Sequence, residues 1–496
     1  MLKSNVTRRR LVVIGAGSAG LCVGVNLKKA GIDDFVILEK GTGVGGTWYH
    51  NSYPGAECDV QSHLYQFSFE QKSDWSAPYG SQAEILDYLN HCYDKFDVRR
   101  HVQFGTKVSD ANWSDDESQW RVTTDTGEIF ECQVLISGLG MFNDLKWPTV
   151  EGIEDFEGDY FHSARWDHDV DLKGKRVGVV GLAASAIQFT PELAKEVEHL
   201  TVYQRTANWV VPKPNTPHSQ ETLDAFCADP NLVKKSRDEI YDVWNTLCTF
   251  TDKKLLGEIE DSGMAQIAEV KDPETRDKLV PHHPFGCKRP LFSGVYYPMF
   301  NRDNVELVTD KVDQVTAKGV ISGGVEREFD AIVYATGFRT TRYLSSINVT
   351  GRGGVGLDEA WEDGAQAYLG ITTSGFPNLF MLYGPNTNQG SIMFMLERQT
   401  NYIMRQLARM EDENLAWVDI RKDVMDDYNT KLQAQLLTID VWQAQCGSDH
   451  YYRSGPNRRM VVAYPRSMDD YLEDTTKAEP ETFEAEVSRK NVDAWG

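Results

Sequence analysis

The stretch LVVIGAGSAG, residues 11–20, limits the possible folds of this chain more than any other. Four apolar residues, typical of a buried strand, run directly into glycines at positions 15, 17 and 20. In this pattern Gly15 permits a tight turn, Gly17 lets the backbone approach a pyrophosphate, and Gly20 lets a helix pack closely on the strand. The sequence therefore predicts a Rossmann-type dinucleotide-binding unit that begins here.

The next apolar stretch, FVILE, ends in Glu39, nineteen residues after Gly20. A carboxylate at this position accepts hydrogen bonds from ribose hydroxyls, whereas it would repel a 2′-phosphate. The first unit is therefore expected to bind FAD or NAD.

A second stretch of this kind, RVGVVGLAASAIQF, covers residues 176–189. Gly181 and Ala186 take the first and third motif positions, Ser185 lies in the turn, and Ala183 stands where the second glycine is expected. Arg205 follows Ala186 by nineteen residues, and a guanidinium grips a 2′-phosphate through paired hydrogen bonds. This pattern predicts an NADPH site, with Ala183 as a crowded position that affects affinity.

Composition excludes several classes of protein. A net charge of -23 argues against a nucleic-acid partner, which needs a basic face. The basic and apolar start RRRLVVIGAGSAG outlines a leader peptide, but its glycines at motif spacing favour mature structure. No stretch is apolar enough to predict a membrane span. The eight cysteines form no C-x-x-C pair, so neither a metal site nor a redox disulfide is expected, and the chain is expected to be cytoplasmic.

The order of these motifs predicts an α/β protein with two Rossmann-like dinucleotide-binding domains. An FAD-binding domain is expected over residues 1–150 and again over 339–496, with an NADP-binding domain over 151–338. Each unit closes with a strand that runs into glycine, at 133–140 and 329–338. Residues 219–280 lack strand patterns and predict a packed insertion of charged amphipathic helices. The acidic last twenty-five or so residues predict a loosely held arm.

A third motif, FEGDYFHSARWD, lies between the two units. Its Phe156, Gly158, His162, Trp166 and Asp167 match F-x-G-x-x-x-H-x-x-x-W-[PD]. The chain thereby resembles the shorter type I Baeyer–Villiger monooxygenases, a family of class B flavoproteins. This resemblance implies FAD and NADPH as cofactors and conversion of ketones to esters or lactones through a C4a-peroxyflavin. It also implies that the fingerprint couples the two domains rather than touching substrate.

The resemblance extends over nearly the whole chain and implies further site residues. Those implied beside the flavin are Thr47, Trp48, Asp59, Tyr65, Val108 and Arg289, those at the NADP phosphates are Arg205, Thr206 and Lys288, and Trp442 is implied as a wall of the nicotinamide site. The segment LFSGVYY lacks an acidic residue that many members carry after the Lys-Arg pair, so details of the substrate pocket are not transferred.

Arg289 is the candidate that stabilises the reactive peroxide anion and the charge developing on the ketone oxygen, because a guanidinium keeps its proton. Asp59 is expected to hold Arg289 as a paired carboxylate, although both residues could instead form a buried ion pair between domains. The expected partners are a small ketone and O2, and the chain is expected to be a monomer or weak homo-oligomer. The nearest alternative hypothesis is a sulfur or nitrogen oxygenase of the flavin-containing monooxygenase type. Sulfoxidation as a side activity is compatible with either hypothesis. A nucleotide-binding module without turnover is a weaker alternative, and a disulfide reductase is disfavoured.

Overall fold

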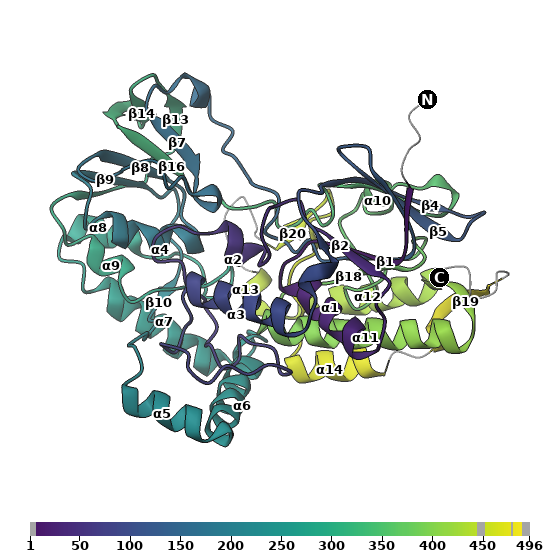
Figure 1. The fold of residues 1–496 in the computed structure, drawn as a ribbon. Helices are drawn as coiled ribbons and strands as arrows, with labels where there is room; N and C mark the ends of the chain where they lie inside the picture. The colour runs from purple at the N-terminus through teal and green to yellow at the C-terminus, as the bar shows by residue number, and fades with distance from the viewer. Residues whose placement is uncertain (1–5, 444–451, 478–479, 489–496) are drawn as a thin grey trace.

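The computed structural model describes residues 6–443, 452–477 and 480–488. These residues form two lobes, each built around a mainly parallel sheet with helices packed against it (Figure 1). The predicted α/β fold with two dinucleotide-binding domains is confirmed. The exact domain boundaries stay a prediction.

The sheet of the first lobe has eight strands in the order β17-β4-β5-β6-β1-β2-β3, with β18 pairing beside β6. Its parallel core places the end of β1 between the ends of β2 and β6, with Ile14 opposite Leu38 and Ser137. The strands are β1 (Val6–Ile14), β2 (Phe35–Leu38), β3 (Val102–Gln103), β4 (Val108–Ser114), β5 (Gln119–Thr124), β6 (Ile129–Ser137), β17 (Asn348–Thr350) and β18 (Leu379–Met381).

The sheet of the second lobe is entirely parallel, in the order β12-β9-β8-β16-β7. Its strands are most fully buried at the centre of the sheet, where β8, β9 and β16 are almost entirely apolar, as expected where helices cover both faces of a parallel sheet. They are β7 (Asp159–His162), β8 (Arg176–Val180), β9 (His199–Tyr203), β12 (Val305–Val308) and β16 (Ala331–Tyr334), beside an antiparallel sheet of β13 (Val312–Val315), β14 (Gly319–Ser322) and β15 (Val325–Glu328).

In each lobe a helix follows one of the central strands of the sheet, and other helices enclose the first lobe. α1 (Ser18–Lys29) follows β1, and α4 (Ala184–Leu193) follows β8. The remaining helices outside the insertion are α2 (Thr47–His50), α3 (Gln82–Lys95), α9 (Tyr296–Met299), α10 (Leu357–Ala360), α11 (Ile392–Asp412), α12 (Lys422–Leu437), α13 (Asp440–Gln443) and α14 (Met468–Thr476). Short strand pairs are β10 (Val210–Val211) with β11 (Leu291–Phe292), β19 (Leu415–Ile420) with β22 (Phe483–Val487), and β20 (Arg453–Ser454) with β21 (Arg459–Met460).

Four helices occupy residues 220–279: α5 (Gln220–Ala228), α6 (Pro230–Leu247), α7 (Lys253–Ile267) and α8 (Pro273–Leu279). Each begins after a serine or aspartate whose side chain accepts a hydrogen bond from the first turn. α6 packs against the first lobe, where Trp244 Nε1 donates to Gln61 Oε1 at 2.8 Å and Arg237 donates to the carbonyl of His63 at 3.0 Å. The insertion therefore bridges the two lobes.

Two chain connections join the lobes, one after β6 and one after β16, and they are bonded to each other. The Lys146 amide donates to the carbonyl of Gly337 at 2.9 Å, and the Arg339 amide donates to the carbonyl of Asp144 at 3.0 Å. The Thr336 hydroxyl also donates to the carbonyl of Lys146. The two connections thus form one short antiparallel crossing.

The expectation of a loosely held C-terminal arm is wrong for the described residues of that segment. Tyr471 of α14 is fully buried, and β22 pairs antiparallel with β19, where Phe483 lies opposite Ile420. Apolar anchors interspersed among the acidic residues hold this part of the chain in place. Residues 489–496 lie outside the described residues.

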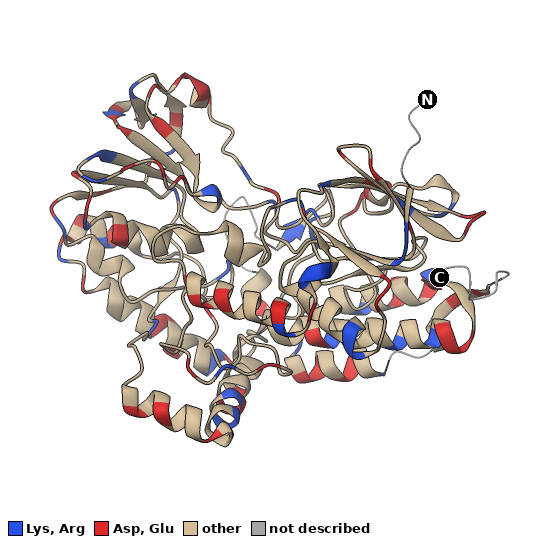
Figure 2. Ribbon diagram, viewed as in Figure 1, with Lys and Arg blue, Asp and Glu red and all other residues tan. Residues whose placement is uncertain are grey.

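Charge is spread over the whole molecule. Figure 2 shows acidic and basic residues mixed over both lobes, without one basic face. Among the helices of the described part of the chain, none has the length and apolar character needed to cross a membrane.

Candidate active site

At two of its three glycines, Gly15 and Gly20, the first glycine loop leaves no room for a side chain. Gly15 has φ +98°, and a Cβ there would lie 2.9 Å from the carbonyl oxygen of Gly138. A Cβ on Gly20 would lie 2.2 Å from the carbonyl oxygen of Gly15, so this glycine allows α1 to pack against the turn. Gly17 begins α1 without a capping side chain, and a Cβ there would meet Gly46 Cα at an ordinary 3.5 Å. The backbone amides in the first turn of α1, which no side chain caps, fit a pyrophosphate.

Glu39 follows β2 directly and is buried. Its Oε2 accepts from the Ala16 amide at 2.8 Å, and its Oε1 accepts from the Gly41 amide at 2.7 Å. The carboxylate therefore holds the glycine loop against the end of β2. Each oxygen keeps a further lone pair, which fits the predicted ribose hydroxyls.

The second loop has the same construction. Gly181 has φ +110°, and a Cβ there would lie 2.6 Å from the carbonyl oxygen of Ala335. Ala183 begins α4 with φ -147° and ψ -175°, an extended backbone that any residue adopts, so its methyl group causes no strain. Like α1, α4 has no capping side chain and no acidic residue in its first turn. Ala186 is fully buried where the third glycine would be, and Ser185 Oγ lies 3.2 Å from Ser163 Oγ.

The register of the sheets refines the position of Arg205. The Gly15 amide donates to the carbonyl of Leu38, and the Gly181 amide donates to the carbonyl of Tyr203. Glu39 therefore corresponds to Gln204, and Arg205 lies one position further, because the connection from Gly181 is one residue shorter. Gln204 is buried and accepts from Tyr296 Oη at 2.9 Å. Arg205 and the neighbouring Thr206 are exposed.

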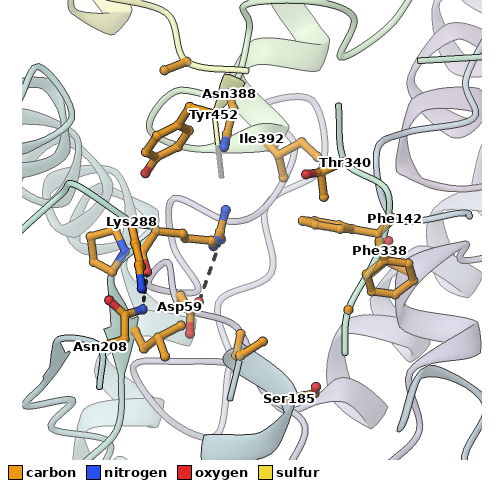
Figure 3. A pocket seen from close by; sticks show the side chains of 18 of the residues that line it. Asp59, Phe142, Ser185, Asn208, Lys288, Phe338, Thr340, Asn388, Ile392 and Tyr452 are labelled. Atoms are coloured by element: carbon orange, nitrogen blue, oxygen red, sulfur yellow. Dashed lines mark hydrogen bonds and ion pairs between the residues drawn. The ribbon is translucent and has the colours of Figure 1, made fainter. Parts of the chain in front are cut away.

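A cavity of about 1280 Å³ lies between the two lobes. Half of the predicted cofactor-binding residues line it: Thr47, Trp48, Asp59, Tyr65, Ala183, Ser185, Lys288, Arg289 and Trp442. Figure 3 shows Asp59, Asn208 and Lys288 on one side of this space, with Phe142 and Phe338 on the other. Gly15, Gly17, Gly20, Glu39, Val108, Gly181, Ala186, Arg205 and Thr206 do not line it, although the two glycine loops lie at the ends of the strands described above.

Part of the cavity lining is aromatic. Trp48, in α2, donates from Nε1 to Tyr65 Oη at 3.1 Å, and the two rings meet edge to face with centroids 5.7 Å apart. Burial raises the pKa of the Tyr65 phenol well above its usual value, so Tyr65 is neutral. Trp442 donates from Nε1 to the carbonyl of Gly286 at 3.2 Å, two residues before Lys288. Val108 begins β4 and is buried.

Charged residues also line the cavity. Arg289 Nη2 lies 3.9 Å from Asp59 Oδ2, and the Asn208 side chain donates to the backbone carbonyl of Arg289 at 3.0 Å. Burial raises the pKa of the Asp59 carboxyl, while Lys213 and Arg289 act to lower it. The structure therefore brings the predicted arginine and carboxylate within ion-pair distance.

Sequence reasoning missed Lys213. Its side chain is 1% exposed, and its Nζ lies 2.7 Å from Glu57 Oε1 and 3.9 Å from Asp59 Oδ1. No motif contains this lysine. The available signal was its place directly after the apolar run WVVP, since a lysine that follows a buried strand requires a buried partner.

None of the five fingerprint residues lines the cavity, and His162 lies beside the crossing connections. The His162 ring packs edge-on against Trp147 at 5.6 Å, and its Nδ1 accepts from the Ala164 amide at 3.1 Å. Burial lowers the pKa of His162 to about 4, so it is neutral near pH 7.

The other fingerprint side chains are structural in their contacts. Phe156 is buried, and a Cβ on Gly158 would lie 2.6 Å from the carbonyl oxygen of Asp330. Trp166 packs on Phe189 with ring centroids 5.2 Å apart, whereas Asp167 is exposed. Within the described ranges, no three His, Cys, Asp or Glu side chains are grouped so as to hold a metal ion.

Two dinucleotide-binding sheets facing one cavity define the class of two-domain pyridine-nucleotide oxidoreductases. Residues 12–237 match the family described as pyridine nucleotide-disulphide oxidoreductase. The Baeyer-Villiger monooxygenase of Pseudomonas aeruginosa is 39% identical over 462 residues, which cover 92% of this chain and 87% of that protein. This chain belongs to the Baeyer–Villiger monooxygenase family.

Two further similarities agree. The FAD-binding monooxygenase ktnD of Aspergillus niger is 37% identical over 467 residues, covering 89% of this chain and 76% of that protein. The crystal structure of cyclohexanone monooxygenase from Rhodococcus sp. Phi1 bound to NADP+ superimposes with a TM-score of 0.86 at 31% identity, covering 98% of this chain and all (100%) of that chain.

Proposed function

We propose that this chain is an FAD-dependent monooxygenase that uses NADPH and O2 to convert ketones to esters or lactones. The observation that carries the proposal is the Arg289–Asp59 pair, 3.9 Å apart, in a cavity that both dinucleotide-binding units reach. The family membership agrees with this reaction.

The residues present fit both cofactors. The loop of Gly15, Gly17 and Gly20 with Glu39 would hold FAD, and Gly181 with the start of α4 would hold the NADPH pyrophosphate. Arg205, Thr206 and Lys288 are the proposed partners of the NADPH phosphates and ribose. When bound, FAD accepts hydride from NADPH and activates dioxygen, chemistry that no side chain supplies.

Arg289 is the proposed catalytic residue. Its guanidinium stays protonated at all working pH values, so it stabilises negative charge at the reacting oxygen without giving up its proton. Asp59 holds the guanidinium in place from inside the cavity wall. The aromatic side chains of Trp48, Tyr65 and Trp442, which line the cavity, would keep water away from the reacting atoms.

We further propose that the protein is cytoplasmic and a monomer or weak homo-oligomer, without a nucleic-acid partner. We propose the FAD-binding domain as residues 1–150 and 339–496, and the NADP-binding domain as 151–338.

The test is to measure NADPH consumption in air, with and without a panel of cyclohexanone, 2-alkanones and acetophenones. Ester or lactone should form in proportion to NADPH. Hydrogen peroxide alone would overturn the proposal, and sulfoxide from a thioether without any ester would favour the heteroatom oxygenase instead.

The Arg289→Ala variant tests the assignment of the catalytic residue. We expect flavin reduction to persist while ester formation falls by roughly 10²–10³-fold, the loss typical of a removed oxyanion-stabilising donor. Arg302→Ala, at an exposed position away from the cavity, is the matched control. Ester formation at the normal rate in Arg289→Ala would show that another group stabilises the charge.

A further inference from the structure

A row of four buried or half-buried charges crosses the boundary between the two units at the cavity wall. Glu57 and Asp59 come from the segment after α2, Lys213 follows β10, and Arg289 precedes β11. Along the row the order is Glu57, Lys213, Asp59, Arg289, so that anions and cations alternate.

Each of the two cations, Lys213 and Arg289, faces a different oxygen of the Asp59 carboxylate. Lys213 Nζ lies 3.9 Å from Oδ1, and Arg289 Nη2 lies 3.9 Å from Oδ2. Oδ1 is buried and accepts no hydrogen bond from any described residue, so the charge on Lys213 is what faces it. Arg289 is much more accessible than Lys213, with side-chain exposures of 35% and 1%.

Glu57 fixes the position of the lysine. Its Oε1 lies 2.7 Å from Lys213 Nζ, and its Oε2 accepts from the Asn215 side chain at 2.7 Å. The Lys213 ammonium also lies 5.0 Å from the centroid of the Tyr79 ring, over its face. An ammonium group this deeply buried is stable only when paired, and two carboxylates this close to one another need a cation between them.

We propose that Lys213 is a positioning residue, which keeps Asp59 ionised and turned toward Arg289; this inference rests on the proposed function of Asp59 and Arg289. Without the lysine, Asp59 Oδ1 would lose the cation that faces it, and the repulsion from Glu57 would add to that loss. Asp59 would then take up a proton or rotate, and Arg289 would lose the partner that holds it in the cavity.

Protonation of Asp59 is therefore the quantity to follow. The charged groups facing it are the cations Lys213 and Arg289 and the anion Glu57. The remaining titratable neighbours are Tyr53, Cys58 and Tyr79, whose pKa values burial raises, so that they are neutral near pH 7. Removing Lys213 should raise the pKa of Asp59, and removing Glu57 should lower it.

The experiment measures ester formation by the holoenzyme as a function of pH in Lys213→Met, Lys213→Arg, Glu57→Gln and the double variant Lys213→Met/Glu57→Gln. Lys213→Met should move the acidic limb of the profile to higher pH by about one unit or more and lower the ester formed per NADPH. Lys213→Arg should restore the wild-type limb, and Glu57→Gln should move it to lower pH. Lys234→Met, on the exposed face of α6, is the matched control.

A second readout does not depend on turnover. In Lys213→Met, folded Asp59 would keep a proton that the unfolded chain releases, so the thermal midpoint of the holoenzyme should fall more steeply than in the control as pH rises. This comparison still tests the inference if the wild-type protein forms no ester, an outcome that would instead reject the proposed function.

Any of three results would overturn the inference. If the double variant regains the wild-type limb, Lys213 serves only to neutralise Glu57. If the limb and the thermal profile of Lys213→Met match those of the control, the lysine does not act on Asp59. Should Lys213→Met fail to fold, Lys213→Arg and Glu57→Gln still decide, because an unmoved limb in Glu57→Gln would contradict the charge row.

Discussion

Ala183 and Gly17 start the two dinucleotide-binding helices, so exchanging their side chains tests both loops by mirrored substitutions. Ala183→Gly removes a methyl group from the proposed NADPH loop, and Gly17→Ala adds one to the proposed FAD loop. Both positions have extended backbone, with φ -147° at Ala183 and φ -84° at Gly17, so neither exchange strains the chain.

The structure sets different magnitudes for the two exchanges. A Cβ on Gly17 meets Gly46 Cα at an ordinary 3.5 Å, so the folded protein accepts it and any loss arises from contact with the ligand. A methyl group forced against a pyrophosphate costs about 1–3 kcal/mol, or roughly 5–150-fold in affinity for FAD. At Ala183 the loop already accommodates the methyl group. Replacing Ala183 with glycine should therefore change the free energy of NADPH binding by less than about 1 kcal/mol, and NADPH should bind slightly more tightly or with unchanged affinity.

The assay is anaerobic reduction of the bound flavin at increasing NADPH concentration, which gives the NADPH affinity of Ala183→Gly. Titration of the apoprotein with FAD gives the affinity of Gly17→Ala. Thermal unfolding of both variants checks that the helices are intact. A rise in the NADPH Kd of Ala183→Gly by tenfold or more would refute the reasoning, because it would show that the methyl group makes a favourable contact with the dinucleotide.

Two further predictions concern charge. Arg205→Ala should weaken NADPH by about tenfold and leave NADH unchanged, because the exposed guanidinium contributes a charge-assisted bond to the 2′-phosphate alone; equal losses for both nucleotides in the same reduction assay would contradict this role. Burial raises the pKa of Asp419 to about 7, above its value in the unfolded chain, so the folded protein binds the extra proton and loses stability as pH rises through about 7. The midpoint of urea unfolding should therefore fall less between about pH 5 and about pH 8 in Asp419→Asn than in the wild type, and parallel pH profiles would count against the assignment.

The sequence predicts those structural features that depend on residues close together in the chain. The turns at Gly15 and Gly181 depend on backbone angles that glycine alone adopts easily, and the strands beside them are buried apolar runs. These features appear in a few consecutive residues, so the two-unit fold could be predicted. The insertion helices likewise have their capping residues within the same segment.

What could not be predicted depends on distant residues or on a single residue of loop length. Lys213 acquires its role from Glu57, 156 residues earlier in the chain (213 minus 57), and no local pattern indicates that the two will meet. Arg205 has the same sequence offset as Glu39 but lies one position further along the sheet edge, because the connecting loop is shorter. The acidic C-terminal segment is held in place by Tyr471 and Phe483, whose burial partners lie elsewhere in the first lobe.

The bonded crossing of the two connections between the lobes has a consequence for how they move. Two independent tethers would allow the lobes to twist, slide and bend relative to each other. Because Lys146 is bonded to Gly337 and Arg339 to Asp144, the two tethers are joined to each other and cannot move independently while these bonds hold. A change in the angle between the lobes would therefore bend the backbone on either side of this crossing, close to Trp147, on which the neutral His162 ring packs.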